Sequence, residues 1–218
     1  MTNDFTSRYL KILNSEFFGL NLTKVLDPDE FYVKQYIDSL YPFNDLSSTK
    51  ELIKNYSLCV DVGFGGGFPL LVLASHFPEI TFVGLEAKNK KVKAVKRIAD
   101  IFGLKNVHVF HLRLEDIFIN CECLLTAKAV GPIGAILKST QIYDVNSHFV
   151  FYKGGLLFQK EDVPKSLSSW RQQTVNTYEI DKQIRNIVVY KNVPRRTMKE
   201  KDRSKNNKKL VKLSELIY

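Results

Sequence analysis

The hydrophobic pattern of the first 55 residues is helical. The first helix face carries apolar residues three or four positions apart, namely Phe5, Tyr9, Ile12 and Leu13. Residues 27–30, Asp-Pro-Asp-Glu, have the proline and acids of a first helical turn, and the apolar run after them ends before Pro42. Residues 47–49 form a further helix start. We therefore expect a helical cap over residues 1–55.

From Leu58 onward, short apolar runs alternate with amphipathic stretches. The expected strands are 58–62, 80–85, 107–111, 123–130, 148–153, 174–180 and 186–192. The helix expected after the first strand ends near residue 76, and three further helices are expected over 90–102, 131–140 and 163–171. This alternation predicts a doubly wound α/β fold with a mostly parallel, seven-stranded sheet, over residues 56–193. The pattern fails after Pro194, so we expect a mobile tail over residues 194–218.

The junction between the first strand and its helix is rich in glycine. Residues 63–69 read Gly-Phe-Gly-Gly-Gly-Phe-Pro. Glycines let the backbone turn sharply and approach a ligand, and ligands of open α/β sheets lie at the carboxyl ends of the strands. The dinucleotide fingerprint does not fit, because its third glycine would fall on Phe68 or Leu70. We therefore expect a cradle for a different cofactor.

The acid and glycines of this stretch indicate which cofactor. Asp61, Gly63, Gly65 and Gly67 are similar to the first motif of class I S-adenosylmethionine-dependent methyltransferases. The second strand ends in Glu86, where an acid can accept hydrogen bonds from a ribose diol. The alternative is a tight turn that needs glycine for backbone reasons alone, with Glu86 as a surface acid.

The charge of the chain is concentrated at its end. Of the net charge of +9, residues 195–218 carry +6, from nine Lys or Arg and three acids. Such a tail suits a polyanion, most simply RNA, although a solvated end that maintains solubility has the same composition.

Several classes of protein do not fit. No apolar run is long enough to span a membrane, and the N-terminus does not resemble a signal peptide, so we expect a cytoplasmic protein. Cys121 and Cys123 have no second pair of ligands, so we expect no metal site.

From about residue 21 to 191, the chain resembles the bacterial 16S ribosomal RNA guanine-N7 methyltransferases of the glucose-inhibited division protein B type. The matching segments are 21–23, 27–30, 33–40, 61–69, 85–87 with 90–91, 113–116 and 152–154. Two positions depart from the family: Gln35 replaces a usual histidine, and Lys128 replaces an arginine. Lysine keeps the charge of arginine but loses its planar fork.

The resemblance implies a donor site and a substrate. S-adenosylmethionine would be held by Asp61, Gly63, Gly65, Gly67, Phe68, Glu86, Leu114, Glu115 and Lys128, with Lys128 contacting the donor or the substrate. The substrate would be 16S rRNA or the small ribosomal subunit, and we expect a monomer. Guanine N7 has an in-plane lone pair and no proton, so no catalytic base is expected. Lys34 and Asp38 are interpreted as helix-packing residues.

Two other functions remain open. The chain is compatible with methyl transfer to a small molecule or protein, which predicts donor binding with weak, salt-insensitive RNA binding. It is also compatible with a non-catalytic RNA-binding module of the same fold, which predicts RNA binding without donor binding.

Overall fold

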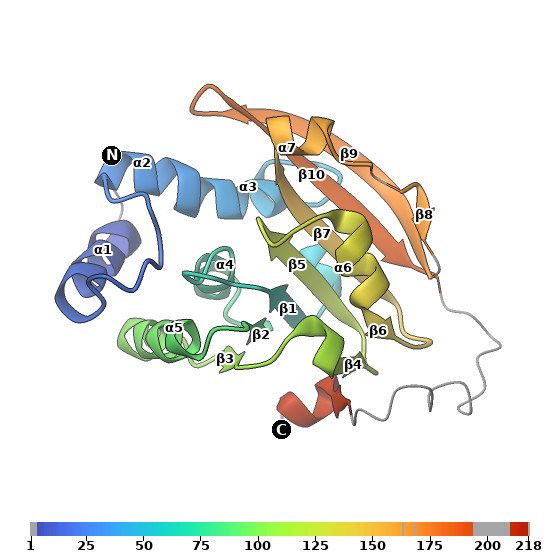
Figure 1. The fold of residues 1–218 in the computed structure, drawn as a ribbon, viewed down its shortest axis with the longest axis horizontal. Coiled ribbons are helices and arrows are strands. Elements are labelled where there is room, and N and C mark those ends of the chain that lie inside the picture. The colour runs from blue at the N-terminus through green and yellow to red at the C-terminus, as the bar shows by residue number, and fades with distance from the viewer. Residues whose placement is uncertain (1–3, 163, 168, 194–209, 218) are drawn as a thin grey trace.

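The computed structural model describes residues 4–162, 164–167, 169–193 and 210–217. Within these residues, eight strands form one sheet in the order β3-β2-β1-β5-β7-β10-β9-β8 (Figure 1). The five parallel strands are β3 (Val107–Phe110), β2 (Thr81–Leu85), β1 (Leu58–Val62), β5 (Cys123–Lys128) and β7 (Ser147–Gly154). The antiparallel strands are β10 (Gln183–Asn192), β9 (Trp170–Ile180) and β8 (Ser166–Leu167).

The predicted fold class is confirmed, and the strand count is corrected. The eighth strand, β8, is a two-residue edge strand, too short to leave an alternating pattern. In the described residues, a second sheet joins three further short strands that the sequence did not predict. They are β4 (Ile117–Ile119), β6 (Gln141–Ile142) and β11 (Val211–Lys212), all parallel.

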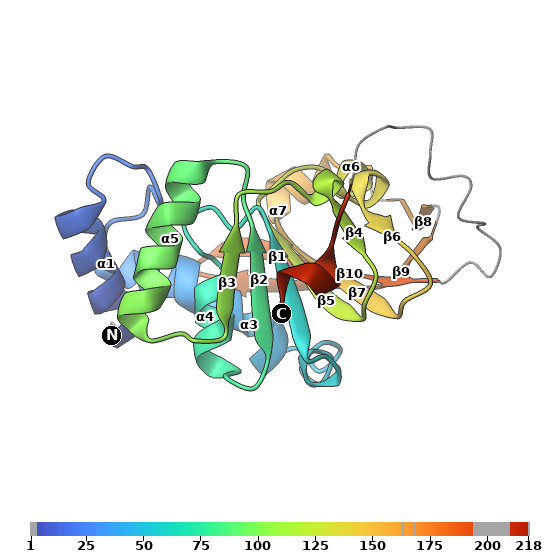
Figure 2. The ribbon, with the colours of Figure 1, turned by 90° about the horizontal axis from the view of Figure 1, so that it is seen from below.

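Two hydrophobic layers cover the opposite faces of the large sheet. Successive strand residues alternate between them, as Cys59 belongs to one layer and Leu58 and Val60 to the other. One layer contains α1 (Asp4–Glu16), α2 (Pro28–Phe31), α3 (Asp38–Asn44), α4 (Leu70–His76) and α5 (Asn89–Phe102). The other contains α6 (Ile133–Ser139) and the small sheet (Figures 1 and 2). This two-sided cover leaves the carboxyl ends of the parallel strands at one edge.

The N-terminal helices differ from the prediction at their end. The helix start expected at residues 27–30 is confirmed, and Asp27 caps α2, its side chain accepting a hydrogen bond from the Glu30 N–H. The chain then passes through a π-helical turn, Tyr32–Ile37, and continues past Pro42 to residue 44. Burial of Pro42 and Phe43 compensates for the missing proline donor. The helix expected from 47–49 is instead a series of turns and a short 3-10 helix, Ile53–Asn55.

The C-terminal third holds two further corrections. The helix predicted over 163–171 is wrong: α7 lies earlier, at Gly155–Gln159, and β9 begins at Trp170. Trp170 is buried against Phe149, and this packing draws the segment into the sheet. The expected mobile tail is wrong for residues 210–217, where β11 pairs with β4 (Figure 2) and the buried Leu213 begins a 3-10 helix, Leu213–Leu216. The rest of the tail, 194–209, lies outside the described residues.

Candidate functional site

The glycine loop occupies the carboxyl end of β1. Gly63, Gly65 and Gly67 have φ angles of +67°, +56° and +92°, a region that residues with a Cβ rarely adopt. The Gly63 N–H donates to the Leu85 carbonyl at 2.7 Å, which joins the loop to the end of β2. The predicted loop and the end of the second strand are therefore in direct contact.

The glycines of this loop face different surroundings. A Cβ at Gly66 would lie 2.5 Å from the Leu22 carbonyl oxygen, and one at Gly67 would lie 2.6 Å from Leu71 Cδ1. Both positions are therefore needed for packing. A Cβ at Gly65 would meet nothing closer than 3.9 Å, with Lys91 Nζ among its nearest neighbours. Of Gly65, Gly66 and Gly67, Gly65 is therefore the glycine that faces open space.

Glu86 holds the loop in place from the end of β2. Its Oε2 accepts a hydrogen bond from the Gly65 N–H at 3.1 Å, and its Oε1 accepts one from the Lys88 N–H at 2.9 Å. The side chain is buried. The carboxylate therefore lies beside the open face at Gly65, where a ligand hydroxyl would compete with the backbone for its oxygens.

Asp61 is a buried acid in β1. Its Oδ1 accepts a hydrogen bond from Thr126 Oγ1 at 2.8 Å, whereas its Oδ2 has no hydrogen-bond partner among the described residues. Burial raises the pKa of Asp61 to about 7, and the Thr126 hydrogen bond opposes that shift. A buried oxygen without a partner is uncommon, and it is free to accept a hydrogen bond from a bound group or a water molecule.

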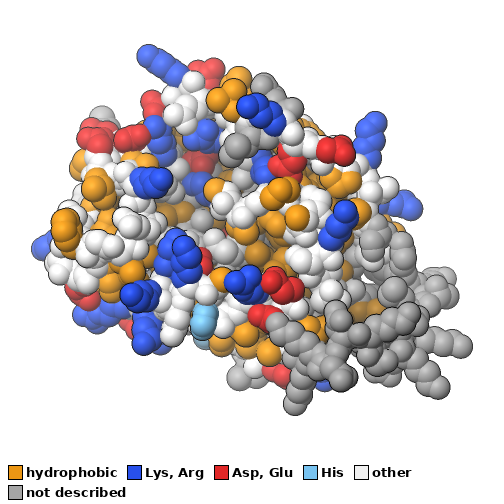
Figure 3. Space-filling view, in the orientation of Figure 1, with side chains coloured by type: hydrophobic (Ala, Val, Ile, Leu, Met, Phe, Trp, Pro, Cys, Tyr) orange, Lys and Arg blue, Asp and Glu red, His pale blue; other side chains and the backbone are white. Residues whose placement is uncertain are grey.

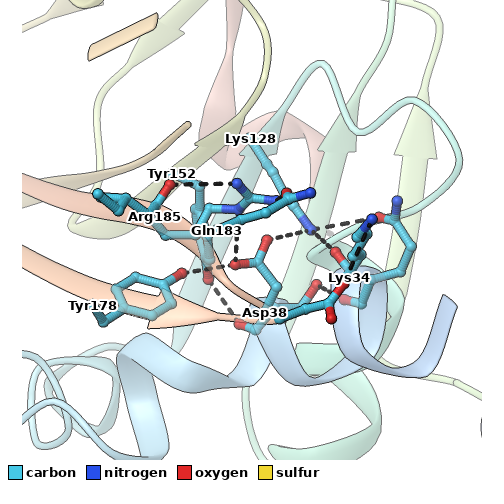
Figure 4. A network of polar contacts seen from close by, with 11 residues as sticks. Lys34, Asp38, Lys128, Tyr152, Tyr178, Gln183 and Arg185 are labelled. Carbon is cyan, nitrogen blue, oxygen red and sulfur yellow. Dashed lines mark hydrogen bonds and ion pairs between the residues drawn. The ribbon is translucent and has the colours of Figure 1, made fainter. Parts of the chain in front are cut away.

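Lys128, at the end of β5, lies in a polar network with the N-terminal helices (Figure 4). Its Nζ contacts Asp38 Oδ2 at 2.9 Å, the Lys34 carbonyl at 3.0 Å and Gln35 Oε1 at 3.4 Å. Lys128 and Gln35, the two departures from the family pattern, therefore touch one another. A lysine has donors only, and the glutamine supplies an oxygen acceptor for them.

Asp38 is the centre of this network. Asp38 is 2 % exposed, and its carboxylate accepts a hydrogen bond from the Tyr178 hydroxyl at 2.8 Å. It also forms ion pairs with Lys128 and, at 3.7 Å, with Arg185 Nε. Arg185 and Tyr178 come from the antiparallel strands (Figure 4). The sequence pattern predicted only helix packing for Asp38, because its position within an apolar helical run shows no sign of a partner on β5.

A cavity of about 1010 Å³ opens beside this network. It lies between the ends of β5 and β7, the start of α6 and residues 160–162. Its wall combines the small or apolar residues Val130, Gly131, Pro132 and Gly154 with charged side chains. The cations, Lys34, Lys128, Lys138, Lys153, Lys160 and Arg185, outnumber the acids Asp38, Glu161 and Asp162. In Figure 3, blue Lys and Arg side chains lie among orange apolar ones on this face. Such a lining suits a flat, partly apolar group attached to an anion.

The remaining predicted site residues lie elsewhere. Phe68 is buried against Tyr9 and Phe31, with ring centroids 5.0 and 5.3 Å apart. Leu114 is buried in the second hydrophobic layer, and the exposed Glu115 pairs with Arg113 at 3.6 Å. The structure therefore brings together Asp61, the glycine loop and Glu86, and it places Lys128 at the cavity next to them.

The chain resembles proteins of known family over most of its length. A family model described as rRNA small subunit methyltransferase G matches residues 2–188. The protein named ribosomal RNA small subunit methyltransferase G from Mycoplasma capricolum is 28 % identical over 79 % of this chain and 74 % of its own length. The protein of the same name from Streptococcus pyogenes is 34 % identical over 61 % of this chain, and the match spans 56 % of its length.

Solved structures support the fold. A mutant of MtNAS in complex with S-adenosylmethionine has a TM-score of 0.53 at 13 % identity, covering 87 % of this chain and 72 % of that one. The same mutant in another crystal structure gives 0.55 at 12 % identity, covering 87 % of this chain and 71 % of that one. At this identity the likeness concerns the fold alone. In the described part of the chain, no helix has the length and apolar character that a membrane span requires.

Proposed function

The chain belongs to the rRNA small subunit methyltransferase G family, and from this membership we propose that it transfers a methyl group to N7 of a guanosine in 16S ribosomal RNA. The methyl donor is S-adenosylmethionine. The observation that carries the proposal is the family match over residues 2–188. The glycine loop and the cavity with its excess of cations support it.

The open side of the glycine loop is the proposed donor site. S-adenosylmethionine carries a sulfonium whose methyl group is open to attack by a nucleophile. Gly65 leaves room for the donor, Glu86 accepts hydrogen bonds from its ribose, and the free Asp61 oxygen faces its amino group, directly or through water. Leu114 and Glu115, which follow β3 at the same edge of the sheet, flank the adenine. Phe68 supports the loop from behind, within its aromatic cluster.

The cavity beside Lys128 is the proposed acceptor site. Guanine N7 needs no proton removed, so the residues here have to orient the base and neutralise its phosphates rather than act as a base. Lys128 is held by Asp38 at the point where the donor and acceptor sites meet. The lysines and the arginine of the wall give this site a positive character that suits RNA.

The finer assignments belong to the same proposal. We propose that residues 1–55 cap the catalytic part, that residues 56–193 bind donor and acceptor, and that the basic residues 194–218 add contacts to RNA. We also propose that the protein acts as a monomer in the cytoplasm, where the ribosomal substrate is assembled.

Methyl transfer is the direct test. The protein is mixed with labelled S-adenosylmethionine and unmethylated 16S rRNA or small subunits, and the labelled nucleoside is identified by mass spectrometry. We expect 7-methylguanosine at one site. Donor binding by calorimetry without any labelled rRNA would favour another acceptor. RNA binding with neither labelling nor donor binding would favour the non-catalytic module.

The role of Glu86 has its own test. Glu86→Gln keeps the shape of the side chain but removes one acceptor oxygen. We expect donor affinity, measured by calorimetry, to fall about tenfold, because an uncharged amide is a weaker acceptor for two ribose hydroxyls. An unchanged affinity in a folded variant would remove Glu86 from the donor site.

A further inference from the structure

Two exposed apolar side chains lie at the edge of the proposed acceptor cavity. Leu156, on α7, is 79 % exposed, and Ile184, on β10, is 49 % exposed. Gly154, two residues before Leu156, and Arg185, next to Ile184, line the cavity itself. The register pairs Arg185 with Gly154, so Ile184 lies opposite Gly155, which precedes Leu156.

The backbone that presents Leu156 is held tightly. A Cβ at Gly155 would lie 2.9 Å from Ile184 Cβ and 3.1 Å from the Ile184 carbonyl oxygen, so α7 and β10 are in close contact at this point. An ion pair also joins the residues before and after α7. Lys153 Nζ contacts Glu161 Oε2 at 2.5 Å and donates to the Gly131 carbonyl at 2.8 Å. Leu156 is thus an exposed side chain on a well-supported backbone.

The charges around this apolar edge suit a nucleic acid. Lys160 and Arg185 line the adjoining cavity, whose wall carries six Lys or Arg and three acids, so its net charge is positive. The exposed Lys182 lies beside Asp181 in the turn between β9 and β10. An apolar side chain beside a surface with an excess of cations is what proteins that unstack bases present to the nucleic acid, since the cations hold the phosphates while the apolar group replaces a stacked base.

We propose that Leu156, supported by Ile184, is a wedge that enters the base stack when the target guanosine turns into the cavity. This inference rests on the proposed function. N7 lies on the major-groove edge of guanine, and in A-form RNA that groove is too deep and narrow for side chains. A paired or stacked guanosine must therefore leave its stack to be methylated, and the wedge offsets the lost stacking.

The test compares two RNA substrates with two variants of the full chain. One substrate is the 16S rRNA fragment around the mapped guanosine, and the other carries an abasic nucleotide beside that guanosine, which weakens its stacking in advance. We expect Leu156→Ser to lower kcat/KM about tenfold on the first RNA and to leave it near wild type on the second. Phe18→Ser is the matched control, since Phe18 is 90 % exposed and follows α1, away from α7 (Figures 1 and 2).

The outcomes separate the two levels of the proposal. A wild-type protein that labels neither RNA would overturn the proposed function. If the wild type is active and Leu156→Ser matches it on the stacked RNA, there is no wedge. An equal deficit on both RNAs would also overturn the wedge, since it would show a general loss of docking. Thermal melting of both variants checks that they fold.

Discussion

Asp61 is a buried acid whose ionisation makes the stability of the protein depend on pH. It is an acid with one unpartnered oxygen inside the described part of the protein, and burial raises its pKa to about 7. The folded chain therefore holds a proton on Asp61 more tightly than the unfolded chain does. Stability from this group is fully present below the ordinary carboxyl pKa and is lost as the pH rises through about 7.

The prediction concerns Asp61→Asn, which keeps the shape and the bond to Thr126. We expect the variant to match the wild type near pH 4 and to exceed it by about 2–4 kcal/mol at pH 8, measured by urea unfolding. We also expect it to bind the donor more weakly, because the amide would present N–H groups toward the donor ammonium. A stability difference that does not change with pH would contradict this assignment.

The ion pair of Asp38 and Lys128 gives a second prediction at this scale. In Asp38→Asn the charged Lys128 amine keeps only uncharged acceptors, such as the Lys34 carbonyl. We therefore expect the free energy of unfolding to fall by about 2–4 kcal/mol. The double variant Asp38→Asn with Lys128→Met should recover part of this loss, because the Lys128 charge is gone and only Arg185 still lacks its partner carboxylate. Methylation should stay low in both variants. Recovery of methylation in the double variant would show that Lys128 only balances Asp38.

Among the elements, those with a clear period were predictable and the shortest were not. Continuous apolar runs located β1 and β2, and helical spacing located α5. The hairpin of β9 and β10 was also predicted, because its strands are long. The strands β4, β6, β8 and β11 have two or three residues each, so no local pattern marks them.

The same limit applies to the site. The rule that ligands bind at the carboxyl ends of strands located the glycine loop and Glu86, whose hydrogen bond to Gly65 agrees with it. The network of Asp38, Lys128 and Arg185 joins three elements that are distant in the sequence. Only the tertiary fold brings them together, so their residue types alone did not reveal the contact.

The glycine loop supports a prediction about neighbouring positions of one element. A Cβ at Gly66 meets the Leu22 backbone, so Gly66→Ala should destabilise the protein by about 1–3 kcal/mol. Gly65→Ala adds its Cβ to the open side, so its main effect should be on donor affinity, with a stability loss of about 1 kcal/mol from its positive φ. Urea unfolding and calorimetry measure the two effects. The reverse order of effects would mean that Gly65 does not face the donor.

At the scale of the whole molecule, the C-terminal segment separates into a basic part and a part that packs on the core. Most of its positive charge lies at residues 195–209, outside the described residues, while Leu213 returns to fill the second hydrophobic layer. The proposed RNA contacts and the completion of the core are therefore separable by substitution, although both are assigned to the last 24 residues.

Separate substitutions test this division. Leu213→Ala should lower the free energy of unfolding by about 2–4 kcal/mol, because it opens a cavity in the second hydrophobic layer beside β4. Replacing the eight Lys and Arg of 195–209 by glutamine should leave the melting temperature unchanged. It should lower RNA affinity and flatten its salt dependence by about one slope unit for each phosphate that is no longer neutralised. If the glutamine variant instead melts at a lower temperature with unchanged RNA affinity, the basic residues serve the fold rather than the substrate.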